Sequence, residues 1–138
     1  MIRVISATGL TANLLRAPPG GYRWRILYFA AWVVIGNGGA GTRAANALLN
    51  FGSPSAVTLN RVGASVSSSL STAGDTVGAI LVPFETGSGV STAFSASGVL
   101  PIGKRCEVSA NDSLVASYTF VTGDTGSALM VVDEVLNE

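Results

Sequence analysis

Residues 22–35 read YRWRILYFAAWVVI, and this stretch decides the fold. In its first half, Tyr22, Trp24 and Ile26 alternate with two arginines, and a period of two is typical of a β-strand. After Ile26 the side chains are apolar at odd and even positions alike, so both faces of the strand require a cover. We interpret one cover as the second sheet of a sandwich and the other as a neighbouring subunit.

The same alternation recurs outward from this strand, with turn signals between the segments. Pro18–Gly21, Asn111–Asp112 and Gly123–Gly126 are the clearest turns. The pattern predicts an all-β protein, a jelly roll or β-sandwich of about eight to ten short antiparallel strands. We expect one domain over residues 18–138, preceded by an N-terminal arm or strand over residues 1–17. Residues 43–51 fit either a strand or a helix.

Composition restricts the class of function. The chain has 138 residues and a net charge of zero, with 48% apolar and only 12% charged residues. The charged share is about half that of ordinary soluble domains, which indicates that part of the surface is covered in the working state. Neutral charge argues against nucleic-acid binding. The longest apolar run, Ile26–Ile35, is well short of the roughly 20 residues of a membrane-spanning helix.

The residue inventory disfavours catalysis. There is no histidine, which removes Ser-His-Asp and Cys-His nucleophile systems and histidine-ligated metals. Cys106 is the single cysteine, so a disulfide within the chain is excluded, and we expect a buried structural thiol. Asp112 and Asp124 are interpreted as turn formers. We therefore expect no catalytic residue, metal, cofactor or small-molecule substrate.

One motif supports an alternative. An apolar strand is followed by Gly36, Gly38 and Gly41 in a G-x-G-x-x-G pattern, which resembles the dinucleotide-binding fingerprint of Rossmann-type proteins. That alternative predicts a helix over residues 42–50, whose N-terminus would bind pyrophosphate. The acidic residue expected about twenty positions later is absent, because Asn60 stands near that place. We prefer a glycine loop between two strands.

Several loose motifs together resemble small structural proteins of tailed phages. They are Gly21-Tyr22-Arg23-Trp24-Arg25-Ile26, the bend Leu100-Pro101-Ile102-Gly103, and Gly123-Asp124 followed by Val132-Asp133-Glu134-Val135. The resemblance is to capsid decoration (cement) proteins with jelly-roll or sandwich folds. It implies a dimer or trimer docked on the major capsid protein at the virion surface, assembled in the host cytoplasm. Head-fibre, tail and baseplate proteins are the alternative virion roles.

The position and composition of the first seventeen residues suggest an arm that adds to another subunit. We expect deletion of residues 1–17 to abolish oligomerisation or particle binding without unfolding the domain. The expected interface residues are Ile2, Val4, Leu14, Leu15, Arg23 and Arg25.

Overall fold

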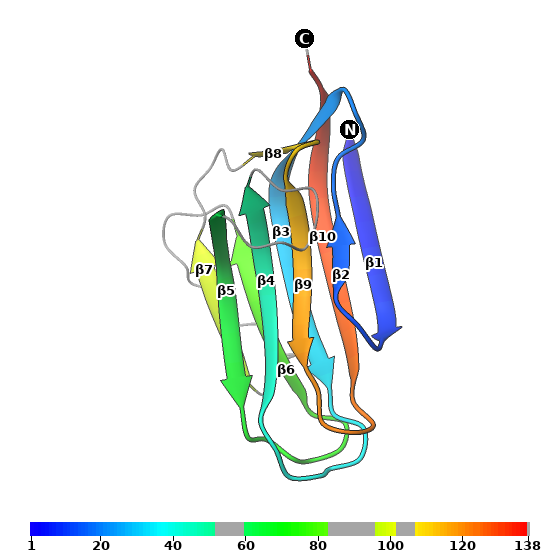
Figure 1. The fold of residues 1–138 in the computed structure, drawn as a ribbon, viewed down its shortest axis with the longest axis vertical. Helices are drawn as coiled ribbons and strands as arrows, with labels where there is room; N and C mark the ends of the chain where they lie inside the picture. Colours follow the sequence, from blue (N-terminus) through cyan, green and yellow to red (C-terminus); the bar gives the residue numbers. More distant parts are fainter. Residues whose placement is uncertain (52–59, 83–95, 102–106, 138) are drawn as a thin grey trace.

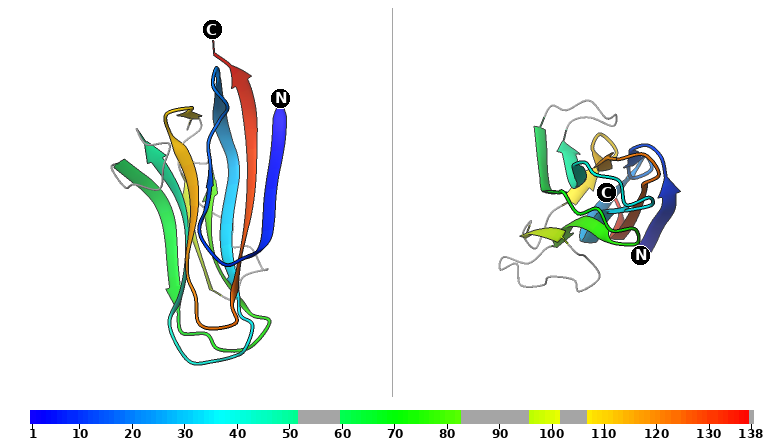
Figure 2. Two further views of the ribbon diagram at one scale, coloured as in Figure 1. Left: turned by 45° about the vertical axis from the view of Figure 1, so that its right-hand side comes forward. Right: turned by 90° about the horizontal axis from the view of Figure 1, so that it is seen from below.

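The protein is a sandwich of two β-sheets, and no described residue lies in a helix (Figures 1 and 2). The computed structural model describes residues 1–51, 60–82, 96–101 and 107–137. Its strands are β1 (Ile2–Leu10), β2 (Leu14–Arg16), β3 (Tyr22–Val34), β4 (Arg43–Phe51), β5 (Asn60–Ser68), β6 (Thr76–Val82), β7 (Ala96–Pro101), β8 (Glu107–Ser109), β9 (Ser113–Thr119) and β10 (Thr125–Leu136). The expected all-β sandwich is thus confirmed. The predicted buried thiol, Cys106, lies outside the described residues.

The first sheet has the strand order β1-β10-β3-β6-β7, and β8 pairs with the start of β3. The second sheet has the order β2-β9-β4-β5. Among the strands that the structure describes, all pairs are antiparallel except β6 with β7, which is parallel, so the expected antiparallel architecture has one exception there.

Strand β3 lies in the middle of the first sheet, between β10 and β6. It pairs with β10 along its whole length and with β6 over its second half. The pairing with β10 shifts between Val131 and Val132, where Tyr28 and Ile26 are the partners and Leu27 is the extra residue of a β-bulge. Phe29 and Ala31 point into the sandwich, so Tyr28, Ala30 and Trp32 point to the outer face of the sheet.

The core lies between the two sheets. The first sheet contributes the fully buried side chains of Trp24, Phe29 and Met130, and the second contributes Leu49 and Leu114. These side chains belong to one continuous apolar cluster, which removes the inward face of each sheet from water.

Residues 43–51 form a strand. β4 lies inside the second sheet, paired with β5 on one side and β9 on the other. Ala45, Ala47 and Leu49 point inward at a period of two and are fully buried. Alanine and leucine favour helices in isolation, but pairing with two neighbouring strands outweighs that local preference.

The first seventeen residues are shared between both sheets of the same chain. β1 forms one edge of the first sheet beside β10, and β2 forms one edge of the second sheet beside β9. Leu14, at the start of β2, belongs to the core cluster and is only 7% exposed. Residues 1–17 are therefore part of the sandwich, whereas the sequence pattern predicts an arm or strand that precedes it.

Candidate functional site

The described residues expose large apolar side chains at one place, the end of the sandwich that carries both termini (Figure 1). Among them, Met1, Ile2, Val4 and Leu136 are the exposed large hydrophobic residues. Ile2 and Val4 are 57% and 64% exposed, on the edge strand β1. We call Ile2 and Val4 the β1 apolar pair. They are two of the residues expected at an interface.

The other expected interface residues have different surroundings. Leu14 is a correction, because it is buried in the core of its own chain and is not available to a partner. Leu15 is partly exposed on β2. Arg23 and Arg25 both contact Glu107 across the β3–β8 pair, at 3.1 Å from Nε to Oε2 and 3.4 Å from Nη2 to Oε1. These two ion pairs are partly open to solvent.

The outer face of the first sheet continues the β1 apolar pair. Inward-pointing Ala128, Met130 and Val132 leave Leu129 and Val131 on the opposite side of β10. The strand register aligns Val4 with Val131 and Tyr28 across this face. Leu129 lies beside Ala30 and Ile80, which are almost completely buried within the chain. A sheet face exposed to water ordinarily carries polar side chains, so the partly exposed apolar row of Val4, Val131 and Tyr28 departs from that pattern.

A polar cluster stands beside β1 at the same end. Glu134 Oε2 accepts hydrogen bonds from Trp24 Nε1 and Arg3 Nη1, each at 2.8 Å. These two donors hold the pKa of the Glu134 carboxyl below its ordinary value of 4.5. The Glu134 carboxylate thus accepts the indole N–H of buried Trp24. It also neutralises Arg3, the single charged side chain of β1.

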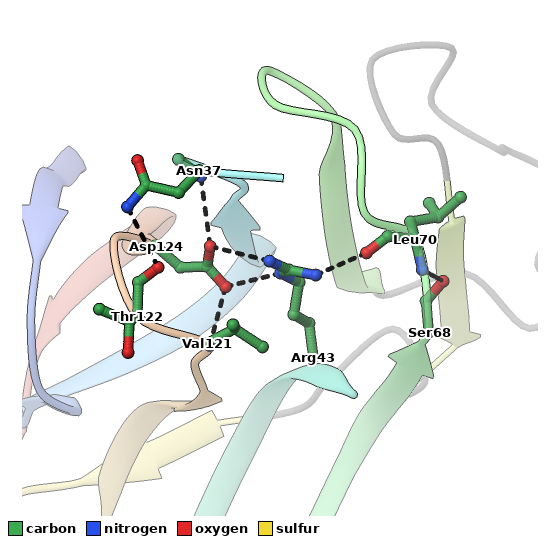
Figure 3. A network of polar contacts seen from close by, with 8 residues as sticks. Asn37, Arg43, Ser68, Leu70, Val121, Thr122 and Asp124 are labelled. Carbon is green, nitrogen blue, oxygen red and sulfur yellow. Dashed lines mark hydrogen bonds and ion pairs between the residues drawn. The ribbon is translucent and has the colours of Figure 1, made fainter. Parts of the chain in front are cut away.

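At the other end of the sandwich, a buried ion pair joins three connecting loops (Figure 3). Asp124 Oδ2 lies 2.7 Å from Arg43 Nε, and both side chains are completely buried. Arg43 Nη2 donates to Asp124 Oδ1 at 3.3 Å, and Arg43 Nη1 donates to the Leu70 carbonyl at 2.7 Å. The carboxylate also accepts the backbone N–H groups of Gly36 and Val121. The β3–β4, β5–β6 and β9–β10 loops therefore meet at one guanidinium and one carboxylate.

The charge of Asp124 is stabilised within this network. Burial by itself raises the pKa of a carboxyl group, but the hydrogen bonds from Arg43, Val121 and Gly36 outweigh it, and the pKa of Asp124 falls below 3.8. Asp124 and the three Arg43 donor groups are all engaged within the chain. A substrate would have to displace one of these bonds, so the arrangement is suited to holding loops together.

Asp124 does form a turn, as the sequence predicts. The Asp124 N–H donates to the Val121 carbonyl at 3.0 Å, and Gly123 has the positive φ of 94° that such a turn requires. The partnership with Arg43 was not anticipated from the sequence. An arginine at the start of an otherwise apolar segment was the available signal, because a charge there needs an opposite charge nearby.

The glycine motif serves loop packing. A Cβ atom at Gly36 would collide with the carbonyl oxygen of Gly123 in the β9–β10 turn, and one at Gly41 would lie 2.7 Å from Val121 Cγ2. The described residues place β4 where the dinucleotide alternative requires a helix, so the helix N-terminus that would bind pyrophosphate is missing. The glycine spacing reflects close contact between two loops.

Two partly buried tyrosines keep their hydroxyl protons at neutral pH. Burial raises the pKa of the Tyr28 hydroxyl and, more strongly, that of Tyr118. Tyr118 Oη donates a 2.6 Å hydrogen bond to the Ser127 carbonyl and its ring stacks on Phe120. Both contacts are structural.

The part of the chain that the structure describes has no group of three acidic, histidine or cysteine side chains placed to hold a metal ion. It also has no helix long and apolar enough to cross a membrane. Comparison with known proteins found no matching family model, no matching curated protein and no matching solved structure.

Proposed function

We propose that this chain is a non-enzymatic structural protein of a virus particle, a capsid decoration (cement) protein that binds the major capsid protein as a dimer or trimer. The observation that supports the proposal is the apolar surface of the first sheet, formed by the β1 apolar pair and the partly exposed Val131 and Tyr28 beside it. An isolated monomer gains nothing from exposing this surface, whereas an assembled shell buries it.

Charge supports the same role. Only 12% of the residues are charged and the net charge is zero, so copies can pack closely without mutual repulsion. The hydrogen-bonding groups of Arg43 and Asp124 are satisfied within the chain. Each contact with a shell is repeated many times by symmetry, so a modest apolar interface adds substantial stability to the whole particle.

The resemblance of the Gly21–Ile26 segment and the later bends to tailed-phage structural proteins specifies the kind of particle. In this role the chain sits at the capsid surface after assembly in the host cytoplasm. It needs no cofactor, nucleic acid or membrane. A head-fibre, tail or baseplate protein would use the same apolar surface. The location of the chain on the particle distinguishes these roles from one another.

The test is mass spectrometry of virus particles purified from the source of this sequence, followed by electron microscopy of those particles labelled with an antibody against the chain. We expect a regular copy number relative to the major capsid protein, with label over the head. Label confined to the tail or to fibres would select the alternative virion roles. Absence of the chain from particles, when it is abundant in the unassembled fraction, would overturn the proposal.

A further inference from the structure

Asn37 and Gly38 form the one Asn-Gly pair of the sequence, and both are exposed in the loop between β3 and β4. Asparagine is a thermolabile residue, because its side-chain carbonyl carbon can react with the backbone nitrogen of the next residue. A following glycine favours this reaction, since it has no Cβ to shield the nitrogen and its backbone rotates freely. The pair therefore combines a reactive sequence with access to water.

The side-chain amide of Asn37 is held weakly (Figure 3). Its Nδ2 donates to the Thr122 carbonyl at 3.5 Å, which is at the outer limit of a hydrogen bond. Asn46 provides a comparison within the second sheet, because its Nδ2 donates to Ser117 Oγ at 2.9 Å. The side chain of Asn37 is thus freer to turn toward its own backbone than that of Asn46.

The backbone nitrogen that follows Asn37 is also available. Among the described residues, no hydrogen bond from the Gly38 N–H is found. Asn111 is the contrasting case, since it is an exposed asparagine in a turn, but the N–H of the next residue, Asp112, donates to the Ser109 carbonyl at 3.0 Å. The two asparagines are both exposed, and they differ in whether the next nitrogen is already engaged.

We propose that Asn37 is a modification site, at which the chain deamidates spontaneously in water. The Gly38 nitrogen forms a bond to Asn37 Cγ, the Cγ–Nδ2 bond breaks, and the Gly38 N–H proton leaves with Nδ2 as ammonia, which gives a cyclic succinimide. Water then opens the ring at Cγ to give aspartate, or at the backbone carbonyl carbon to give isoaspartate. Nothing is oxidised or reduced, and the proposal does not depend on a role in a virus particle.

Either product changes the electrostatics of this end of the sandwich. The chain has a net charge of zero, so each conversion leaves it with one extra negative charge. In the aspartate product an acceptor oxygen replaces the Nδ2 donor that faces the Thr122 carbonyl. Arg43 does not compensate, because Asp124 and the Leu70 carbonyl already engage it. We expect the modified loop to hold the β9–β10 turn less firmly.

Peptide mapping by mass spectrometry tests the modification on the full chain, kept warm in a mildly alkaline buffer over several days. We expect conversion at Asn37 to proceed at least about tenfold faster than at Asn111 in the same sample. Labelling by an isoaspartate-specific carboxyl methyltransferase should rise in parallel. Ion-exchange chromatography should show a more acidic species that grows at the same rate.

The matched control is N37Q, which keeps an amide at the same exposed position but forms the corresponding ring far more slowly. It should gain neither the isoaspartate label nor the acidic species. Gly38 is left unchanged, because it has a φ of 60° and a Cβ there would lie 2.9 Å from the Ser71 carbonyl oxygen. An alanine at that position would strain the loop and confuse the comparison.

N37D tests the consequence, since it carries the new charge from the start. We expect it to melt at a lower temperature than N37Q, with faster hydrogen–deuterium exchange in residues 121–124. Equal melting and exchange would overturn the loosened loop and leave the modification standing. Conversion at Asn37 no faster than at Asn111 would overturn the site itself, and conversion without any isoaspartate would overturn the succinimide route.

Discussion

Arg43 and Asp124 form an ion pair that is buried inside the protein. Their side chains are completely buried, and together they hold the loops that close one end of the sandwich. Breaking a buried ion pair from one side leaves the other charge without a partner in a medium of low polarity, which is costly. The pair contributes to the specificity of the loop arrangement more than to net stability, since burying both charges has a large desolvation penalty of its own.

Replacement of Asp124 by asparagine tests this view. We expect D124N to lower the free energy of unfolding by about 3 kcal/mol, because the shape is retained while the Arg43 charge stays buried and loses its counter-charge. Urea denaturation followed by tryptophan fluorescence measures the change. The control is E107Q, whose ion pairs with Arg23 and Arg25 are partly exposed, and it should cost less than about 1 kcal/mol. Equal effects of the two variants would contradict a special role for the buried pair.

The pH dependence of stability follows from the lowered pKa of Asp124. Its pKa in the folded protein lies below 3.8, so the unfolded chain takes up a proton first as the pH falls. The stabilisation from this carboxylate is therefore complete well above pH 3.8 and is lost as the pH falls through the folded-state pKa. We expect the difference in unfolding free energy between wild type and D124N to be constant near neutral pH and to shrink in acid. A difference that stays constant down to pH 2, or grows in acid, would show that this ionisation does not account for it.

At the scale of elements, close contact between loops decides which glycines are needed. Gly36 ends the β3 segment directly against the β9–β10 turn, where the Gly123 carbonyl occupies the place of a side chain. Gly20, in the turn before β3, has open space around its Cβ position and no positive φ. Two glycines near the ends of the same strand are thus under different constraints.

Alanine substitution separates these two cases. G36A should lower the free energy of unfolding by about 1–3 kcal/mol, because the added methyl group forces two backbone segments apart. G20A should leave stability unchanged or raise it by up to about 1 kcal/mol, since it only reduces the freedom of the unfolded chain. Thermal or urea unfolding of both variants provides the measurement. Equal tolerance at both positions would contradict the close packing of the two loops.

At the scale of the whole molecule, the distribution of charge predicts how the protein associates. The assembly contact that we propose covers the β1 apolar pair, and Glu134 of the same chain neutralises Arg3, the single charged side chain of β1. We expect the dissociation constant of the oligomer to change less than about threefold between 0.05 and 0.5 M salt, because no net charge is brought together. Sedimentation at several salt concentrations measures it. A steep weakening with salt would point to an interface dominated by ion pairs, such as the Arg23–Arg25–Glu107 cluster.

Local patterns in the sequence by themselves determined the all-β class, a strand over residues 22–35, of which β3 covers residues 22–34, and the Gly123–Asp124 turn. The alternation of side chains and the conformational requirements of turns depend on a few neighbouring residues. Strands and turns of this kind can therefore be predicted from the sequence. Expectations failed or stayed open where distant residues decide the outcome. Leu14 has the sequence surroundings of an arm residue, yet β9 draws it into the core.

Tertiary structure alone decided that residues 43–51 form a strand, that Arg43 meets Asp124, and that β1 and β2 join opposite sheets. Each depends on contacts between segments far apart in the chain, such as the 81 positions between Arg43 and Asp124. Strand pairing and burial of charge are properties of the assembled sandwich, and they outweigh local preference because they act on the whole core at once.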